Sequence, residues 1–172
     1  MARRHPNVAN LDEVEAMDTA KAFNRSEADL GVFGAKFRRL ADATGGRSIG
    51  CSFFEVAPGR TAYPFHWHLA NEEALIVVSG EGTLRIGDAE VAVRGGDYVA
   101  FPVGLAHAHQ LKNTGDEPLR YYCISTLLDP EVCGYPDSKK IGTLSRKGPL
   151  RFVFREDDNR DYFDREPLAG KK

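Results

Sequence analysis

Two short stretches of this sequence contain the residue types that bind metal ions. In the first, His66 and His68 stand two positions apart, and Glu73 follows after a short polar segment. Side chains two residues apart on a β-strand point to the same side, so the two imidazoles converge if this stretch is extended. If the next strand returns antiparallel, Glu73 lies beside them. Two imidazole nitrogens and one carboxylate oxygen facing one point form half of the shell of a divalent transition metal.

The second stretch, from Gly96 to Asn113, holds another pair of histidines two positions apart, His107 and His109. On a strand both would lie on one face, so either can supply a fourth ligand. Any one of these residues alone is more often a packed or solvated side chain than a ligand. Their combination, at strand spacing within apolar sequence, favours a metal site.

The segments that must position these residues are short and rich in β-formers. Glu73 opens an apolar run to Ser79 with the character of a buried strand. Further short apolar segments follow at 83–86, 90–93, 98–101, 108–113 and 119–126. Turn-forming Gly, Pro, Asn and Asp residues separate them, and no segment between them is long enough for a crossover helix. The sequence therefore predicts an all-β fold, an antiparallel jelly roll or small barrel.

The 172-residue chain suits a single domain with terminal extensions. We expect a polar arm over residues 1–30, a barrel over 31–135, and an extension over 136–172 with one added strand at LRFVFRE. A long irregular connection over residues 127–148 should carry one further short strand. Because exposed strand edges are normally covered, the extension folds back on its own barrel or pairs with a neighbour, and we expect a homodimer.

Composition excludes several classes of function. A net charge of -2 gives no electrostatic basis for binding nucleic acid. No apolar run approaches the roughly 20 residues that cross a bilayer, so we expect no membrane association. The first residues lack the apolar centre of a signal peptide, which predicts a cytoplasmic protein. The three cysteines contain no Cys-x-x-Cys pair, which argues against a disulfide framework and a structural zinc site.

The first stretch resembles the first motif of the cupin superfamily, which reads Gly, His-x-His, three or four residues, Glu, six residues, Gly. The residues that match are His66, His68, Glu73 and Gly80. Gly59 stands one residue further from the first histidine than the pattern asks.

The second stretch resembles the second cupin motif, which reads Gly, five residues, Pro-x-Gly, two residues, His, three residues, Asn. From the left the match runs through Gly96, Pro102, Gly104 and His107. From the right, Asn113 points to His109, because the chain has two residues more than the pattern between Gly104 and Asn113. We prefer His109 as the fourth ligand, since the following hairpin fixes the strand register. His107 remains an alternative or additional ligand.

The resemblance covers about residues 48–126 and implies a cupin-type antiparallel jelly-roll barrel. It also implies one divalent metal ion, of Fe, Mn, Ni, Cu or Zn, held by His66, His68, Glu73 and His109. Four protein ligands leave one or two coordination positions open to water, dioxygen or a bidentate substrate.

On family grounds we expect a metal-dependent enzyme acting on a small molecule, an oxygenase first and an isomerase or decarboxylase next. The alternatives are a cupin that binds a small ligand without turnover and a purely structural barrel. Strand alternation suggests a substrate pocket lined by Tyr63, Phe65, Phe101, Gln110 and Leu111. Trp67 should face away from the histidines on either side of it.

Overall fold

The computed structural model describes residues 5–167, and most of its regular structure is β-strand. The strands are β1 (Met17–Asp18), β2 (Lys36–Arg39), β3 (Ile49–Val56), β4 (Trp67–His68), β5 (Glu73–Ser79), β6 (Glu81–Ile86), β7 (Ala89–Arg94), β8 (Tyr98–Phe101), β9 (His109–Asn113), β10 (Leu119–Thr126), β11 (Glu131–Tyr135), β12 (Lys140–Leu144) and β13 (Arg151–Arg155). The short α-helices are α1 (Thr19–Phe23), α2 (Glu27–Leu30) and α3 (Leu40–Ala43), and 3-10 turns span Leu11–Glu13, Leu105–His107, Pro136–Ser138 and Glu156–Asp158.

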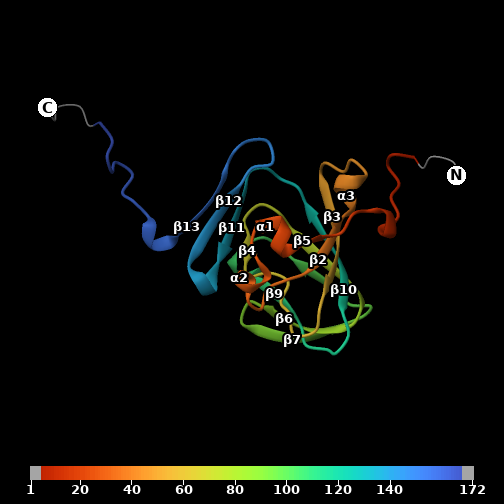
Figure 1. The fold of residues 1–172 in the computed structure, drawn as a ribbon. Helices are drawn as coiled ribbons and strands as arrows, with labels where there is room; N and C mark the ends of the chain where they lie inside the picture. Colours follow the sequence, from red (N-terminus) through yellow and green to blue (C-terminus); the bar gives the residue numbers. More distant parts are fainter. Residues whose placement is uncertain (1–4, 168–172) are drawn as a thin grey trace.

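The strands form antiparallel sheets around one core (Figure 1). One sheet has the order β1-β2-β3-β10-β5-β8, and two smaller sheets have the orders β7-β6-β9 and β13-β12-β11-β4. Isolated antiparallel bridges from Thr61 to Lys112 and from His66 to His109 join β9 to the segment that leads into β4. The two smaller sheets therefore continue one another across this segment. This arrangement confirms the predicted all-β antiparallel jelly roll.

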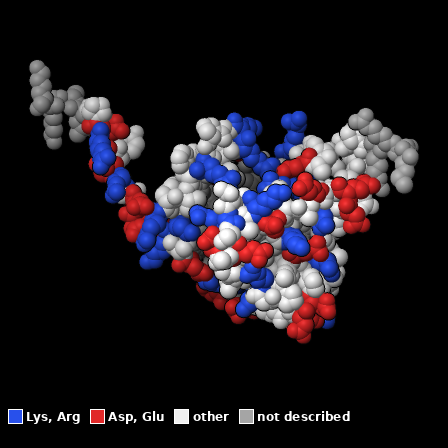
Figure 2. Space-filling model, in the orientation of Figure 1, with Lys and Arg blue, Asp and Glu red and all other residues white. Residues whose placement is uncertain are grey.

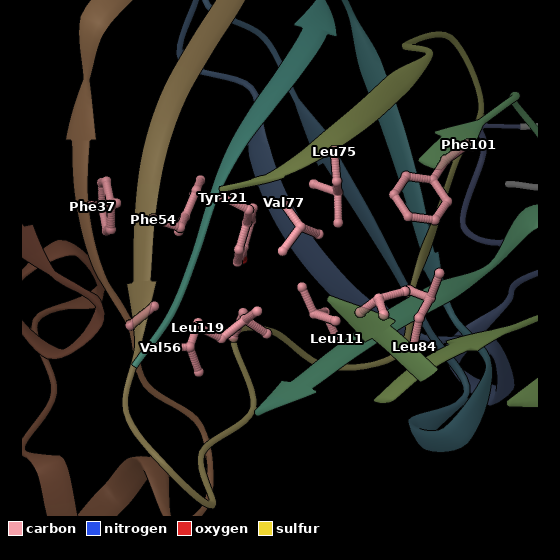
Figure 3. Packing of buried hydrophobic residues seen from close by; sticks show 13 residues of the cluster. Phe37, Phe54, Val56, Leu75, Val77, Leu84, Phe101, Leu111, Leu119 and Tyr121 are labelled. Atoms are coloured by element: carbon pink, nitrogen blue, oxygen red, sulfur yellow. The ribbon is translucent and has the colours of Figure 1, made fainter. Parts of the chain in front are cut away.

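Strand alternation decides which side chains enter the core (Figure 3). On β5, Leu75 and Val77 are buried, whereas Ile76 and Val78 face solvent. The buried cluster adds side chains from the other strands, including Phe37, Phe54, Val56, Leu84, Phe101, Leu111, Leu119 and Tyr121. Burial of this apolar surface is the main force that holds the sheets together.

Both predicted extensions contain more structure than expected. Within the predicted arm of residues 1–30, β1 pairs with β2, and the buried Thr19 hydroxyl hydrogen-bonds the carbonyl and amide of Ala35. The strand expected at LRFVFRE is β13, and β12 precedes it in 136–172. The connection 127–148 holds two strands, β11 and β12, where one short strand was expected. The ends of both segments, 1–4 and 168–172, lie outside the described residues, and the proposed division into three segments stays a prediction.

Acidic and basic side chains are interspersed on the face of the molecule shown in Figure 2. This mixture agrees with the small net charge. Within residues 5–167, no helix is both long and apolar enough to span a membrane.

Trp67 packs across the neighbouring strand, away from the histidines on either side. It lies opposite Gly134 of β11, and a Cβ atom built on Gly134 would come within 2.1 Å of its indole nitrogen. Only glycine leaves room for the indole at this position. The close packing of Trp67 on Gly134 therefore helps to hold β4, and with it His68, against β11.

We expect Gly134→Ala to lower the free energy of unfolding by about 1–3 kcal/mol, the usual cost of forcing extra volume into a packed site. Denaturant unfolding followed by fluorescence of Trp67, the single tryptophan, would measure the loss. Gly148→Ala is the matched control, because its nearest neighbouring atom would be 3.8 Å away. Equal stability of the two variants would contradict the packing argument.

Candidate metal centre

Three strands bring four side chains together at one end of the core. His68 ends β4, Glu73 begins β5, and His109 begins β9, while His66 immediately precedes β4. Reciprocal backbone hydrogen bonds, 2.8 and 3.1 Å long, pair His66 with His109. One potential ligand atom from each of the four side chains lies within 4.8 Å of the others. Residues 69–72 connect β4 to β5, but these two strands lie in different sheets and do not pair with each other. The expected antiparallel return is therefore wrong, and Glu73 reaches the histidines from the other sheet.

The Glu73 carboxylate lies between two of the imidazoles. Its Oε2 atom is 3.5 Å from Nε2 of His68 and 3.4 Å from Nε2 of His109. The His109 ring also stacks on Phe101, with ring centroids 3.7 Å apart. Phe101 therefore covers one face of the His109 ring within the group.

The other ring nitrogen of two histidines is engaged by a backbone carbonyl. Nδ1 of His66 lies 2.8 Å from the carbonyl oxygen of Pro64, and Nδ1 of His109 lies 3.1 Å from that of His107. A carbonyl only accepts hydrogen bonds, so Nδ1 carries a proton in both rings, and Nε2 is the nitrogen left to bind a metal ion. Metal-binding histidines commonly make this contact, which fixes their tautomer and orientation.

One atom of the group fits a metal ion especially well. Among the residues that the structure describes, Nε2 of His68 is buried and has no hydrogen-bond partner. A buried polar atom without a partner is costly, and its 3.5 Å separation from Glu73 is too long for a good hydrogen bond. A cation between the four side chains would satisfy this atom. The four side chains therefore form a candidate metal site.

Burial and neighbouring charges set the protonation of the group. Burial, together with His109 and His68, lowers the pKa of His66 to about 4. Burial alone would raise the pKa of Glu73, but the adjacent imidazoles hold it well below its usual range. Burial alone would lower the pKa of His68, but Cys133, Glu131 and Glu73 hold it above its usual value. Without metal at neutral pH, Glu73 is thus an anion, His66 is neutral and His68 is protonated.

The structure places His109 in the group and His107 outside it. His107 lies in the 3-10 turn that precedes β9. Asn113 shares the buried face of β9 with His109, and its amide donates to the carbonyls of Val56 and Glu117 at 2.7 and 2.9 Å. Asn113 thereby holds the hairpin that sets the register of β9. These positions favour His109 over His107 as the fourth potential ligand.

The five residues expected to line a substrate pocket have different surroundings. Phe101 packs on His109, and Tyr63 meets His66 edge to face at a centroid distance of 6.4 Å. Leu111 is a buried core residue.

Phe65 and Gln110 depart from the expected pocket. Phe65 is covered by the guanidinium of Arg85, which lies 3.6 Å from the ring centroid. Gln110 alternates with His109 on β9, so it points to the other face, and its amide donates to the Tyr63 carbonyl. The pocket lining therefore stays a prediction, with Gln110 on the strand face opposite His109.

Sequence reasoning missed a second contributor to the site, the strand β11. Its residues Glu131, Cys133 and Tyr135 share one face, and that face is turned toward His68 and His66. The Cys133 sulfur lies 3.4 Å from Nδ1 of His68, and the Tyr135 ring stacks 6.2 Å from that of His66. The sequence signal for this strand was the alternation of Glu131, Cys133 and Tyr135, which would share one face of a strand. The signal is weak because these residues follow the second motif, in a segment whose sequence looks irregular.

Comparison with known proteins places this geometry in a family. The cupin domain family matches residues 52–125. A putative sugar phosphate isomerase from Acidithiobacillus ferrooxidans is 30% identical with a TM-score of 0.69, and the match covers 83% of this chain and 94% of that protein. No match was found among curated proteins.

Two more distant structures share the fold. A sugar phosphate isomerase from a cupin superfamily, from Silicibacter pomeroyi, is 24% identical with a TM-score of 0.74, covering 90% of this chain and 96% of that one. A predicted oxalate decarboxylase from Thermotoga maritima is 18% identical with a TM-score of 0.57, covering 70% and 99%. The chain belongs to the cupin superfamily, as its two motifs indicated.

We expect metal binding at neutral pH to release about one proton, because a metal ligand must be deprotonated and His68 is protonated in the metal-free protein. Affinity should consequently rise with pH. Calorimetric titration with Mn²⁺ in buffers of different ionisation enthalpy would measure the release. A binding enthalpy that is independent of the buffer would contradict the protonation assigned to His68.

Proposed function

We propose that this protein is a metal-dependent isomerase of small phosphorylated sugars. The observation that carries the proposal is the convergence of His66, His68, Glu73 and His109, whose potential ligand atoms lie within 4.8 Å of one another. The reaction class is supported by the 30% identical relative, described as a putative sugar phosphate isomerase and matched over 94% of its length. This replaces our first expectation of an oxygenase, which no relative described above supports.

In the proposed site, Nε2 of the three histidines and the Glu73 carboxylate hold one divalent ion of Fe, Mn, Ni, Cu or Zn. The donor set of nitrogen and oxygen atoms suits all five. When bound, such an ion would act as a Lewis acid toward the carbonyl and hydroxyl oxygens of a sugar.

The protein's own residues would orient the substrate and restrict water. Tyr63 and Tyr135 flank His66. Burial raises the pKa of Tyr63 to about 12 and also raises that of Tyr135, so both present a neutral hydroxyl rather than a phenolate at neutral pH. Such hydroxyls can donate hydrogen bonds to substrate oxygen atoms. The aromatic surroundings limit the number of water molecules that compete with them.

We expect His66→Ala and Glu73→Ala to empty the metal site while the barrel stays folded, because neither side chain belongs to the apolar core cluster. Elemental analysis of protein purified without chelator or metal-affinity resin would report occupancy, and circular dichroism would report folding. Glu72→Ala, an exposed neighbour in the same turn, is the control. Full metal retention by both site variants would contradict the ligand assignment.

The activity itself is tested by incubating reconstituted protein with a panel of aldose and ketose phosphates and following their interconversion by NMR. We expect turnover by the wild type, and at least a 100-fold loss in His66→Ala. Oxygen uptake, measured in parallel, separates an isomerase from an oxygenase. A fully metal-loaded protein that consumes oxygen, or that converts none of the sugar phosphates, would overturn the assigned reaction.

The expected homodimer and cytoplasmic location stay predictions.

A further inference from the structure

A buried carboxylate lies beside the candidate metal site but is not one of its four residues. Glu131 is the first residue of β11, and only 6% of it is exposed. Two positions along the strand, Cys133 pairs with His68. A buried carboxylate needs compensating hydrogen bonds or charges, so its partners indicate what it does.

Most of those partners belong to the turn between His68 and Glu73. Oε1 of Glu131 accepts hydrogen bonds from the backbone N–H groups of Leu69 and Ala70 at 3.2 and 3.1 Å. Oε2 accepts from the backbone N–H of Asn71 at 2.9 Å. One carboxylate therefore gathers three successive N–H groups of the segment that separates two of the candidate ligands.

The Asn71 side chain ties the same turn to the chain that precedes β11. Its amide nitrogen donates to Glu131 and to the carbonyl of Leu128, and its oxygen accepts from the N–H of Leu128 at 2.6 Å. The Thr126 hydroxyl also donates to this oxygen, at 3.1 Å. The turn is thus held by hydrogen bonds both to Glu131 of β11 and to residues 126–128, which precede β11.

Glu131 also reaches the outer nitrogen of His68. Its Oε2 atom lies 3.7 Å from Nδ1, an ion-pair distance, and the Cys133 sulfur lies 3.4 Å from the same nitrogen. In His66 and His109 this position is occupied by a backbone carbonyl. For His68, the strand β11 supplies side chains instead, and they leave Nε2 directed toward Glu73.

We propose that Glu131 is a positioning residue, which fixes the turn at residues 69–71 and the orientation of His68 so that His68 and Glu73 can bind the same ion. This inference rests on the proposed metal-binding function. A metal ligand usually depends on such outer contacts, and their loss typically weakens metal binding by about 10- to 100-fold.

A second ion between His68, Glu131 and Cys133 is the competing interpretation, since their potential ligand atoms also lie within 4.8 Å of one another. Both Glu131 oxygens, however, already accept backbone N–H groups, and Val132 N–H adds a further bond to Oε1 at 2.8 Å. An ion there would have to compete with these hydrogen bonds. The contacts therefore favour a positioning role for Glu131.

The test is the dissociation constant for Mn²⁺, measured by chelator competition, in the wild type and in Glu131→Gln. Glutamine has one acceptor oxygen, and its NH₂ group would face N–H donors in either orientation. We expect binding to weaken by about 10- to 100-fold in protein that circular dichroism shows to be folded. Glu72→Gln removes the same charge from an exposed position next to the turn and should change the constant less than twofold.

Glu131→Asp covers the case in which the glutamine variant does not fold. It keeps the carboxylate but withdraws it by one methylene, and we expect a smaller loss of about three- to tenfold. A wild-type dissociation constant in either folded Glu131 variant would overturn the proposal. So would weaker binding in Cys133→Ala but not in the Glu131 variants, because the thiol would then orient His68.

A double-mutant cycle separates positioning from general destabilisation. Because Glu131 contacts His68 as well as the turn, Glu131→Gln should cost less affinity in a His68→Ala background than in the wild type. Equal costs in both backgrounds would contradict the proposal. If wild-type protein binds none of Mn²⁺, Fe²⁺, Ni²⁺, Cu²⁺ and Zn²⁺, the proposed function fails together with this inference. If it binds and His66→Ala abolishes binding while Glu131→Gln does not weaken it, only this inference fails.

Discussion

The two backbone hydrogen bonds between His66 and His109 join the halves of the candidate site. They belong to the antiparallel bridge that connects β9 with the segment leading into β4, and this bridge makes the two smaller sheets continuous. A shift of one residue in this pairing would turn His109 away from the core and replace it with a neighbour. The position of the metal-binding groups therefore depends on strand register, which the Asn113 hairpin helps to fix.

The second constraint is electrostatic. Two carboxylates, the partly buried Glu73 and the buried Glu131, lie on opposite sides of the His68 ring. Buried charges are tolerated when they are paired and hydrogen-bonded, and breaking such a pair leaves the remaining charge uncompensated. In this arrangement Glu131 is satisfied largely by backbone N–H groups, whereas Glu73 has imidazole neighbours at 3.4 and 3.5 Å. A cation between Glu73 and the three histidines would give the Glu73 carboxylate a close partner that compensates its charge.

Period-two spacing predicted much of the site. The spacing of His66 and His68 predicted their convergence, whereas Glu73 joins them from a different sheet and not by the expected pairing of β4 with β5. The fourth position required the register of β9, which the Asn113 hairpin indicated. The same alternation that turns His109 inward turns Gln110 to the other face of β9.

The contribution of β11 could not be read from local sequence. Glu131 lies about 60 residues from the turn that it holds, and nothing near either segment encodes the pairing of β11 with β4. Tertiary context commonly overrides local strand preference in this way.

The most direct test of the account is a crystal structure of the Mn²⁺-loaded protein with anomalous diffraction data. We predict one anomalous peak, about 2.0–2.3 Å from Nε2 of His66, His68 and His109 and from a carboxylate oxygen of Glu73. The Glu131 carboxylate should still bind the turn and should not touch the ion. A peak between Glu131 and Cys133, or well-ordered histidines with no peak among them, would contradict the central claim.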